Sequence, residues 1–140
     1  MYQKDYILRM IEMLGDLLRA VLGWMAKKDF TKAEEKLSEA YISLLRKDAS
    51  FFTDIPADKL TATLLQDHHY TNDHLLILAE LFNAEALLRD ARKQYAGSVP
   101  FYEKALILFR FFDENDRTWS EERQQKMKKI KERIDELNKM

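Results

Sequence analysis

The chain of 140 residues contains no cysteine, only three glycines and only two prolines. The absence of cysteine excludes disulfide bonds, thiolate nucleophiles and zinc sites with cysteine ligands. The scarcity of glycine and proline leaves few positions at which a helix would be interrupted. These absences favour a chain built from long helices, and a sequence without cysteine fits a protein of the cytoplasm.

Neither sign of charge is in excess, because 23 lysines and arginines face 24 aspartates and glutamates. This balance provides no overall attraction to nucleic acid or to an anionic membrane. The first 26 residues lack the unbroken apolar run of a signal peptide or a transmembrane helix, because four charged residues interrupt it. We therefore expect a cytoplasmic protein that binds neither nucleic acid nor a membrane.

Apolar residues recur at helical spacing along the chain, and no segment alternates as a half-buried strand does. We predict an all-α fold of about six helices in a single domain over residues 1–140, a length that can bury a core. The expected helices cover about 4–27, 31–47, 55–66, 72–95, 99–112 and 118–138. The segment 48–54 is expected to be a connector in which Phe51 and Phe52 form an aromatic plug, and the last helix has only a thin apolar seam.

Three of these helices begin with the sequence of a helix cap. Thr31 precedes Glu34 by three residues, which is typical of a capping box. Thr118 precedes Glu121 in the same way. Thr71, or the asparagine after it, is expected to cap the helix over 72–95.

The helix expected over 4–27 is apolar around most of its circumference, an arc of about 240°. Its charged residues form one narrow stripe: Asp5, Arg9, Glu12, Asp16 and Arg19. We therefore place this helix at the centre of the domain, with another helix close to Gly15, because a glycine inside a helix costs about 1 kcal/mol relative to alanine. The helix over 99–112 is also apolar over a wide arc. Either the segments 48–54, 55–66 and 118–138 cover the excess apolar surface or a second subunit does, and we favour a symmetric homodimer.

Two stretches that lie 65 residues apart share one pattern. In each, an aromatic residue at a turn is followed by a small residue three positions later, a large residue seven later and an alanine ten later. The corresponding pairs are Phe30 and Tyr95, Ala33 and Ser98, Leu37 and Tyr102, and Ala40 and Ala105. This pattern resembles the second half of a tetratricopeptide repeat, in which small residues let two antiparallel helices pack closely.

The resemblance covers residues 17–45 and 82–110 and implies antiparallel helical hairpins. The two units are 65 residues apart rather than 34, so a helical insert at about 55–66 separates them. Val21 also stands where the repeat has a small residue. The opening residues 2–13, YQKDYILRMIEM, are similar to the start of an uncharacterised family of small helical bacterial proteins, a resemblance that implies no activity.

Tetratricopeptide proteins bind peptides in a groove formed by their first helices. The resemblance therefore implies a non-enzymatic protein-interaction or scaffold module with a protein or peptide partner. It places the groove positions of the first unit at Gly15, Leu18, Arg19, Leu22, Met25 and Ala26. It places those of the second unit at Glu80, Asn83, Ala84, Leu87, Asp90 and Ala91. These positions lack the paired cations of a carboxylate clamp, so the insert or another subunit could instead fill the groove.

The alternative hypothesis rests on the polar segment 67–74, which holds all three histidines of the chain. His68, His69 and His74, with Asp73, have side chains that bind metal ions. A metal- or small-ligand-binding protein, or an enzyme, that uses this loop is therefore the second hypothesis. The spacing lacks an i, i+4 pair on one helix face, and a helix-capping loop explains the same residues. We identify no catalytic residue and expect no metal and no cofactor.

Overall fold

The computed structural model describes residues 4–116 and 119–140, and all regular secondary structure in these ranges is helical. The all-α prediction is confirmed, with seven α-helices instead of six. They are α1 (Lys4–Ala26), α2 (Phe30–Leu45), α3 (Ala49–Thr53), α4 (Leu60–Ala62), α5 (Asn72–Ala91), α6 (Tyr95–Asp116) and α7 (Glu121–Asn138). A 3-10 turn, η1 (Ala57–Lys59), and a π-helical turn, η2 (Thr63–Asp67), flank α4.

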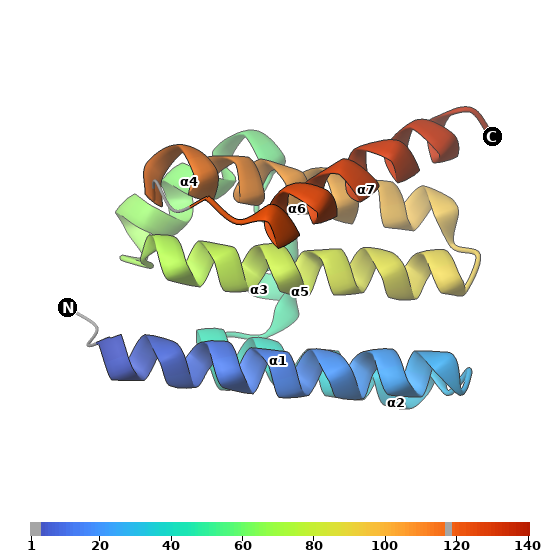
Figure 1. Ribbon diagram of the computed structural model, residues 1–140, viewed down its shortest axis with the longest axis horizontal. Helices are drawn as coiled ribbons and strands as arrows, with labels where there is room; N and C mark the ends of the chain where they lie inside the picture. The colour runs from blue at the N-terminus through green and yellow to red at the C-terminus, as the bar shows by residue number, and fades with distance from the viewer. Residues whose placement is uncertain (1–3, 117–118) are drawn as a thin grey trace.

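The long helices form two hairpins, α1 with α2 and α5 with α6, and these two pairs share the most extensive contacts. Contacts of α5 with α2 and α1 join the hairpins, and α7 packs on α6. In Figure 1, α5 lies between α1 below and α6 and α7 above, and α2 lies behind α1. The central helix is therefore α5, and our prediction that the first helix lies at the centre is wrong.

The position of α1 also changes the interpretation of its glycine. A Cβ atom added at Gly15 would meet only the side chain of Arg19, at 3.4 Å. The expected close approach of another helix of this chain to Gly15 is therefore wrong. Periodicity identified the apolar arc of α1 correctly, but it does not indicate how much of that arc the chain itself covers.

Both hairpins are closed by the same kind of turn. Lys28 and Lys93 take up left-handed φ values of 61° and 62°. The amide of the residue after each lysine donates to the carbonyl five residues earlier, at 2.9 and 2.8 Å. Such bonds satisfy carbonyls at a helix C-terminus. The second turn therefore lies at 92–94, and residues 96–98, which we expected to form it, belong to α6.

The helix caps explain where α2 and α7 begin. The Asp29 side chain accepts a hydrogen bond from the amide of Lys32 at 3.2 Å, so α2 begins at Phe30 and the predicted cap Thr31 lies inside its first turn. Ser120 caps α7, whereas the expected cap Thr118 lies outside the described residues. Along α7 the predicted thin seam is confirmed.

The segment expected to be a connector contains α3, because Asp48 caps it by accepting from the amide of Phe51 at 3.2 Å. Phe52 is buried as predicted and stacks on Tyr41, with ring centroids 6.0 Å apart. Phe51 is half-buried and meets Phe52 edge to face at 4.9 Å. The aromatic pair thus anchors α3 against the core.

The small and large residues of the repeated pattern occupy equivalent positions in the two hairpins. The six residues that follow the aromatic ones are each at most 2% exposed: Ala33, Leu37, Ala40, Ser98, Tyr102 and Ala105. The aromatic residues Phe30 and Tyr95 are the first residues of α2 and α6. Residues 65 positions apart therefore share the same burial and the same place in a helix.

Ala40→Leu and Ala105→Leu should each overpack a hairpin, because a larger side chain has no free space at a buried alanine. We expect each to lower the free energy of unfolding by about 1–3 kcal/mol, measured by chemical denaturation. Ala96→Leu, at an exposed position of α6, is the matched control and should change little. Unchanged midpoints for both buried-site variants would mean that these alanines are not close-packing positions.

Candidate functional site

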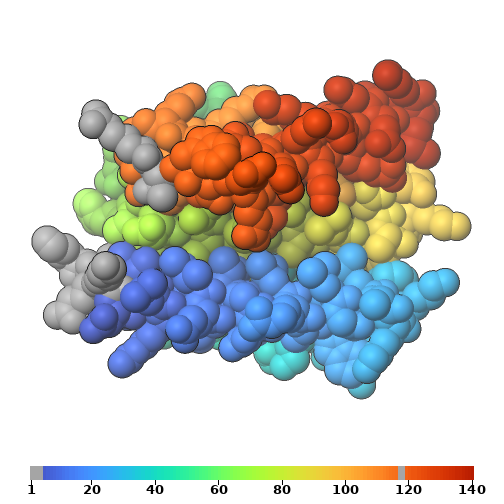
Figure 2. Space-filling view, in the orientation of Figure 1, coloured from blue at the N-terminus to red at the C-terminus, as the bar shows by residue number. Residues whose placement is uncertain are grey.

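The helices α1, α5 and α7 share one face of the molecule. In the space-filling view α5 is set back between α1 and α7, so it forms the floor of a depression whose sides are the two other helices (Figure 2). A cavity of about 570 Å³ opens between α5 and α7. A second hollow of about 290 Å³ is lined by residues of α1, α5, α6 and α7. We call this surface the α1–α5–α7 face.

The larger cavity combines apolar and charged side chains. Leu87 of α5 and Ile130 of α7 provide apolar surface, and Asn83 of α5 adds an amide. Asp90, Tyr102 and Arg133 are the polar residues at one end. Such a mixture of apolar surface and a few placed polar groups is typical of a binding site.

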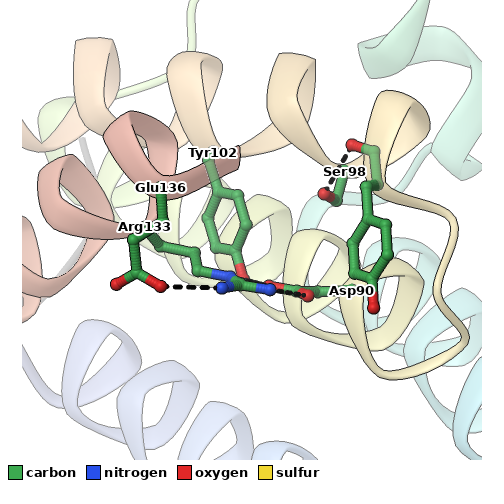
Figure 3. A network of polar contacts seen from close by, with 6 residues as sticks. Asp90, Ser98, Tyr102, Arg133 and Glu136 are labelled. Atoms are coloured by element: carbon green, nitrogen blue, oxygen red, sulfur yellow. Dashed lines mark hydrogen bonds and ion pairs between the residues drawn. The ribbon is translucent and has the colours of Figure 1, made fainter. Parts of the chain in front are cut away.

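A network of hydrogen bonds joins α5, α6 and α7 at this end of the cavity (Figure 3). Nε and Nη2 of Arg133 donate to the two oxygens of Asp90, both at 2.7 Å. The Tyr102 hydroxyl donates to Asp90 Oδ2 at 2.8 Å. Nη1 of Arg133 donates to Glu136 at 2.9 Å, and Ser98 Oγ in the same view donates to a carbonyl of its own helix.

This network shifts the pKa values of Asp90 and of Tyr102, which donates to it. Hydrogen bonds from the Arg133 guanidinium lower the pKa of the Asp90 carboxyl. Burial, together with the nearby Asp90 carboxylate, raises the pKa of the Tyr102 hydroxyl. Both oxygens of Asp90 already accept hydrogen bonds, so Asp90 is a poor proton acceptor. The two charged hydrogen bonds from Arg133 therefore attach α7 to α5 at Asp90.

Further polar contacts fasten the N-terminal half of α7. Lys126 Nζ donates to both oxygens of Glu80 on α5, at 2.7 and 2.8 Å. Arg123 and Gln124 each donate to Asp113 of α6 at 2.5 Å. With the Asp90–Arg133 pair, these bonds attach α7 at several points along its length, on either side of the cavity.

A separate polar cluster lies between α2 and α5. Glu85 is next to Arg89, with 3.9 Å between the charged atoms, and burial raises the pKa of the Glu85 carboxyl. Burial also raises the pKa of the Tyr41 hydroxyl, and the nearby Glu85 raises it further. Arg92 bonds to Glu34 at 3.0 Å. Opposite charges are balanced here, so we interpret the cluster as a cross-link between the hairpins.

The groove positions predicted for the second unit lie beside these cavities. Asn83, Leu87 and Asp90 line the larger one, and Glu80 lines the smaller one. Ala84 is buried. Ala91, the sixth position, is exposed at the end of α5.

The positions predicted for the first unit lie elsewhere, along the outer face of α1. Arg19, Leu22 and Ala26 are exposed, whereas Gly15, Leu18 and Met25 are half-buried. Arg19 forms an ion pair with Asp16 of the same helix. These residues do not line the larger cavity, but the neighbouring Ile11 lines the smaller one.

Sequence reasoning missed the contribution of α7. Lys126, Ile130 and Arg133 are spaced four and three residues apart and therefore lie on one helix face. This spacing could have identified them, but most of the residues around them are charged or polar. The structure shows that Lys126 and Arg133 instead pair with acids of α5.

The three histidines have separate local contacts. The Nδ1 atom of His74 accepts from the Thr71 amide at 3.1 Å, and Thr71 caps α5 as predicted. The ring of His68 meets that of Phe51 at 4.8 Å, and His69 is an exposed loop residue with a φ of 58°. Burial and the nearby Asp116 raise the pKa of Asp73. Over residues 4–116 and 119–140, no three histidine or acidic side chains are grouped so that they could hold a metal ion.

No protein-family model, curated protein or solved structure matches this chain. In the described part of the chain, no helix combines the length and the apolar character that crossing a membrane requires. The interpretation of the site therefore depends on the geometry of this chain alone.

Arg133→Gln should weaken the attachment of α7, because it removes the charged hydrogen bonds to Asp90 and leaves that carboxylate unpaired. We expect the free energy of unfolding to fall by about 1–3 kcal/mol in chemical denaturation. The control is Lys129→Gln, which removes a charge from an exposed position of the same helix. Equal stability of both variants would contradict a docking role for the Asp90–Arg133 pair.

His74 should make stability depend on pH near neutrality. Burial lowers the pKa of His74, which is 4% exposed, so below about pH 6.5 the unfolded chain binds more protons than the folded one. Stability from this residue is therefore complete above that pH and decreases as the pH falls. The measurement is urea denaturation at several pH values between about 7.5 and 5.5.

His74→Gln should reduce this pH dependence, because glutamine can still complete a capping box but does not titrate. His69→Asn is the control, since asparagine tolerates a left-handed φ and His69 is exposed. A slope against pH that is the same in both variants would assign the effect to other groups.

Proposed function

We propose that this chain is a non-enzymatic protein-interaction module of the cytoplasm, built from two tetratricopeptide-like hairpins, that binds a protein segment on the α1–α5–α7 face. The observation that carries this proposal is the exposed apolar surface of α1 beside the cavities. Leu8, Ile11 and Leu22 are 49%, 44% and 49% exposed. Ile11 also lines the smaller hollow, so this apolar surface continues toward α5 and α7.

An isolated exposed leucine needs no explanation, but apolar residues gathered on one face of a helix next to a groove are typical of an interaction site. Leu87, which is 36% exposed, continues the apolar surface into the larger cavity. Binding of an apolar segment would remove these side chains from water. The hydrophobic gain is about 25 cal/mol for each Å² of apolar surface that is buried.

The polar residues of the face support binding rather than catalysis. Asp90 and Glu80, the carboxylates that α5 directs toward α7, are both held in ion pairs. The metal-binding alternative has less support, because His74 and His68 are engaged in capping and ring packing within the chain. A protein or peptide partner is therefore the better proposal.

Site-specific photo-crosslinking tests this function. A photoreactive phenylalanine derivative at Leu22 or Leu87 should crosslink partner protein in the native cells, and excess unmodified chain should compete. The same group at Ile42, which is 55% exposed on α2, is the matched control and should not give these products. Equal products from all three positions, or none from Leu22 and Leu87, would contradict the proposal.

A further inference from the structure

Six residues on one side of α1, of which three are exposed and three are half-buried, follow the spacing of a coiled-coil seam. They recur at intervals of three and four residues: Leu8, Ile11, Gly15, Leu18, Leu22 and Met25. A repeat of this kind keeps one side of a helix facing a second helix. Figure 2 shows α1 lying along the front of the molecule, uncovered by the other helices on this side. We call these six positions the α1 seam.

The two edges of the α1 seam differ in character. Glu12 and Arg19, both exposed, lie along one edge. Leu14 and Val21 lie along the other edge and are buried in the core of the chain. Any second helix on the seam therefore meets charges on one side and the body of the molecule on the other.

We propose that the occupant of the α1 seam is α1 of a second copy of this chain, packed antiparallel about a two-fold axis between residues 16 and 17. This inference rests on the proposed function, because it names the partner for the α1 part of the same face. The axis pairs residues whose numbers add to a constant. Leu8 then faces Met25 of the second copy, Ile11 faces Leu22, and Gly15 faces Leu18.

Charge complementarity supports the antiparallel orientation. In antiparallel packing the charged edges of the two helices lie side by side, so Glu12 of each copy approaches Arg19 of the other. Two-fold symmetry then forms two equivalent ion pairs. In parallel packing the charged edge would instead face the edge of Leu14 and Val21, which offers no charged partner.

The same arrangement explains Gly15. A glycine opposite Leu18 of the second copy provides a hole into which the larger side chain can pack, as alternating large and small residues do in a tight core. The space over Gly15 is bounded only by the end of the Arg19 side chain, which can move. The helical cost of the glycine is thus offset by contact with a second chain.

The interface is small, because the α1 seam from Leu8 to Met25 is only about 26 Å long. A seam of this length buries less than the about 1,600 Å² of a standard interface. We therefore expect a reversible dimer with a dissociation constant in the micromolar range. Sedimentation or light scattering should show a mass that rises from 16.7 kDa toward twice that value as the concentration increases.

Charge exchange tests the pairing. Glu12→Arg alone should weaken the dimer roughly tenfold or more by placing like charges together, and so should Arg19→Glu alone. An equimolar mixture of these two variants should dimerise again, because each ion pair is then restored between unlike copies. Both positions are exposed, so circular dichroism should show that the variants stay folded.

Cysteine crosslinking tests the orientation, because the chain has no cysteine of its own. Ile11→Cys mixed with Leu22→Cys should form a disulfide between the two variants under mild oxidation. Either variant alone should not, because in the antiparallel dimer each of these positions lies about 16 Å from its own copy along the helix axis. Efficient crosslinking of Ile11→Cys alone would show a parallel dimer and overturn the proposal.

The failure of this inference and that of the proposed function give different results. A mass that stays at 16.7 kDa at every concentration, with photo-crosslinks still confined to Leu22 and Leu87, overturns the second copy as occupant but leaves the proposed function intact. A dimer whose mass is unaffected by either charge reversal overturns the pairing at the α1 seam. A monomer without crosslinks from this face overturns both.

Discussion

The burial of α5 is the constraint on which the rest of the structure depends. Ten of its twenty residues are buried, and its contacts include α1, α2 and α6. A helix that is apolar around most of its circumference cannot be stable in water unless other elements surround it. The two hairpins, joined by contacts of α2 and α1 with α5, satisfy this requirement. The connection through α3 and α4 places the second hairpin against the first.

The attachment of α7 depends on polar contacts as well, because its apolar seam is too thin to hold it by hydrophobic contact alone. Met127, Ile130 and Leu137 are buried, and most of the remaining surface of α7 is polar or charged. Ion pairs that are shielded on one side by α5 and α6 supplement this seam. Because the pairs lie on either side of Leu87 and Ile130, the same contacts that hold α7 also form the walls of the cavity.

The helices and the repeated pattern could be predicted from the sequence, because both depend on local spacing. The seam of α7 and the cap at Thr71 are of this kind. We placed the turn of the second hairpin at 96–98 because glycine favours turns and Gly97 lies there. In the structure Lys93 instead takes up the left-handed conformation that closes the hairpin. The central place of α5 and the pairing of Arg133 with Asp90 depend on contacts between distant segments, which periodicity does not indicate.

The left-handed residues at the helix ends link the fold to its ionic surroundings. Lys28, Arg46 and Lys93 adopt a backbone conformation that favours glycine, yet all three carry a positive charge. A cation beside the last carbonyls of a helix gains about 0.3–1 kcal/mol from the helix dipole at low ionic strength. Dissolved salt screens this gain but leaves the steric strain unchanged. Concentrated salt should therefore loosen the helix ends at Lys28, Arg46 and Lys93 before it affects the hydrophobic core.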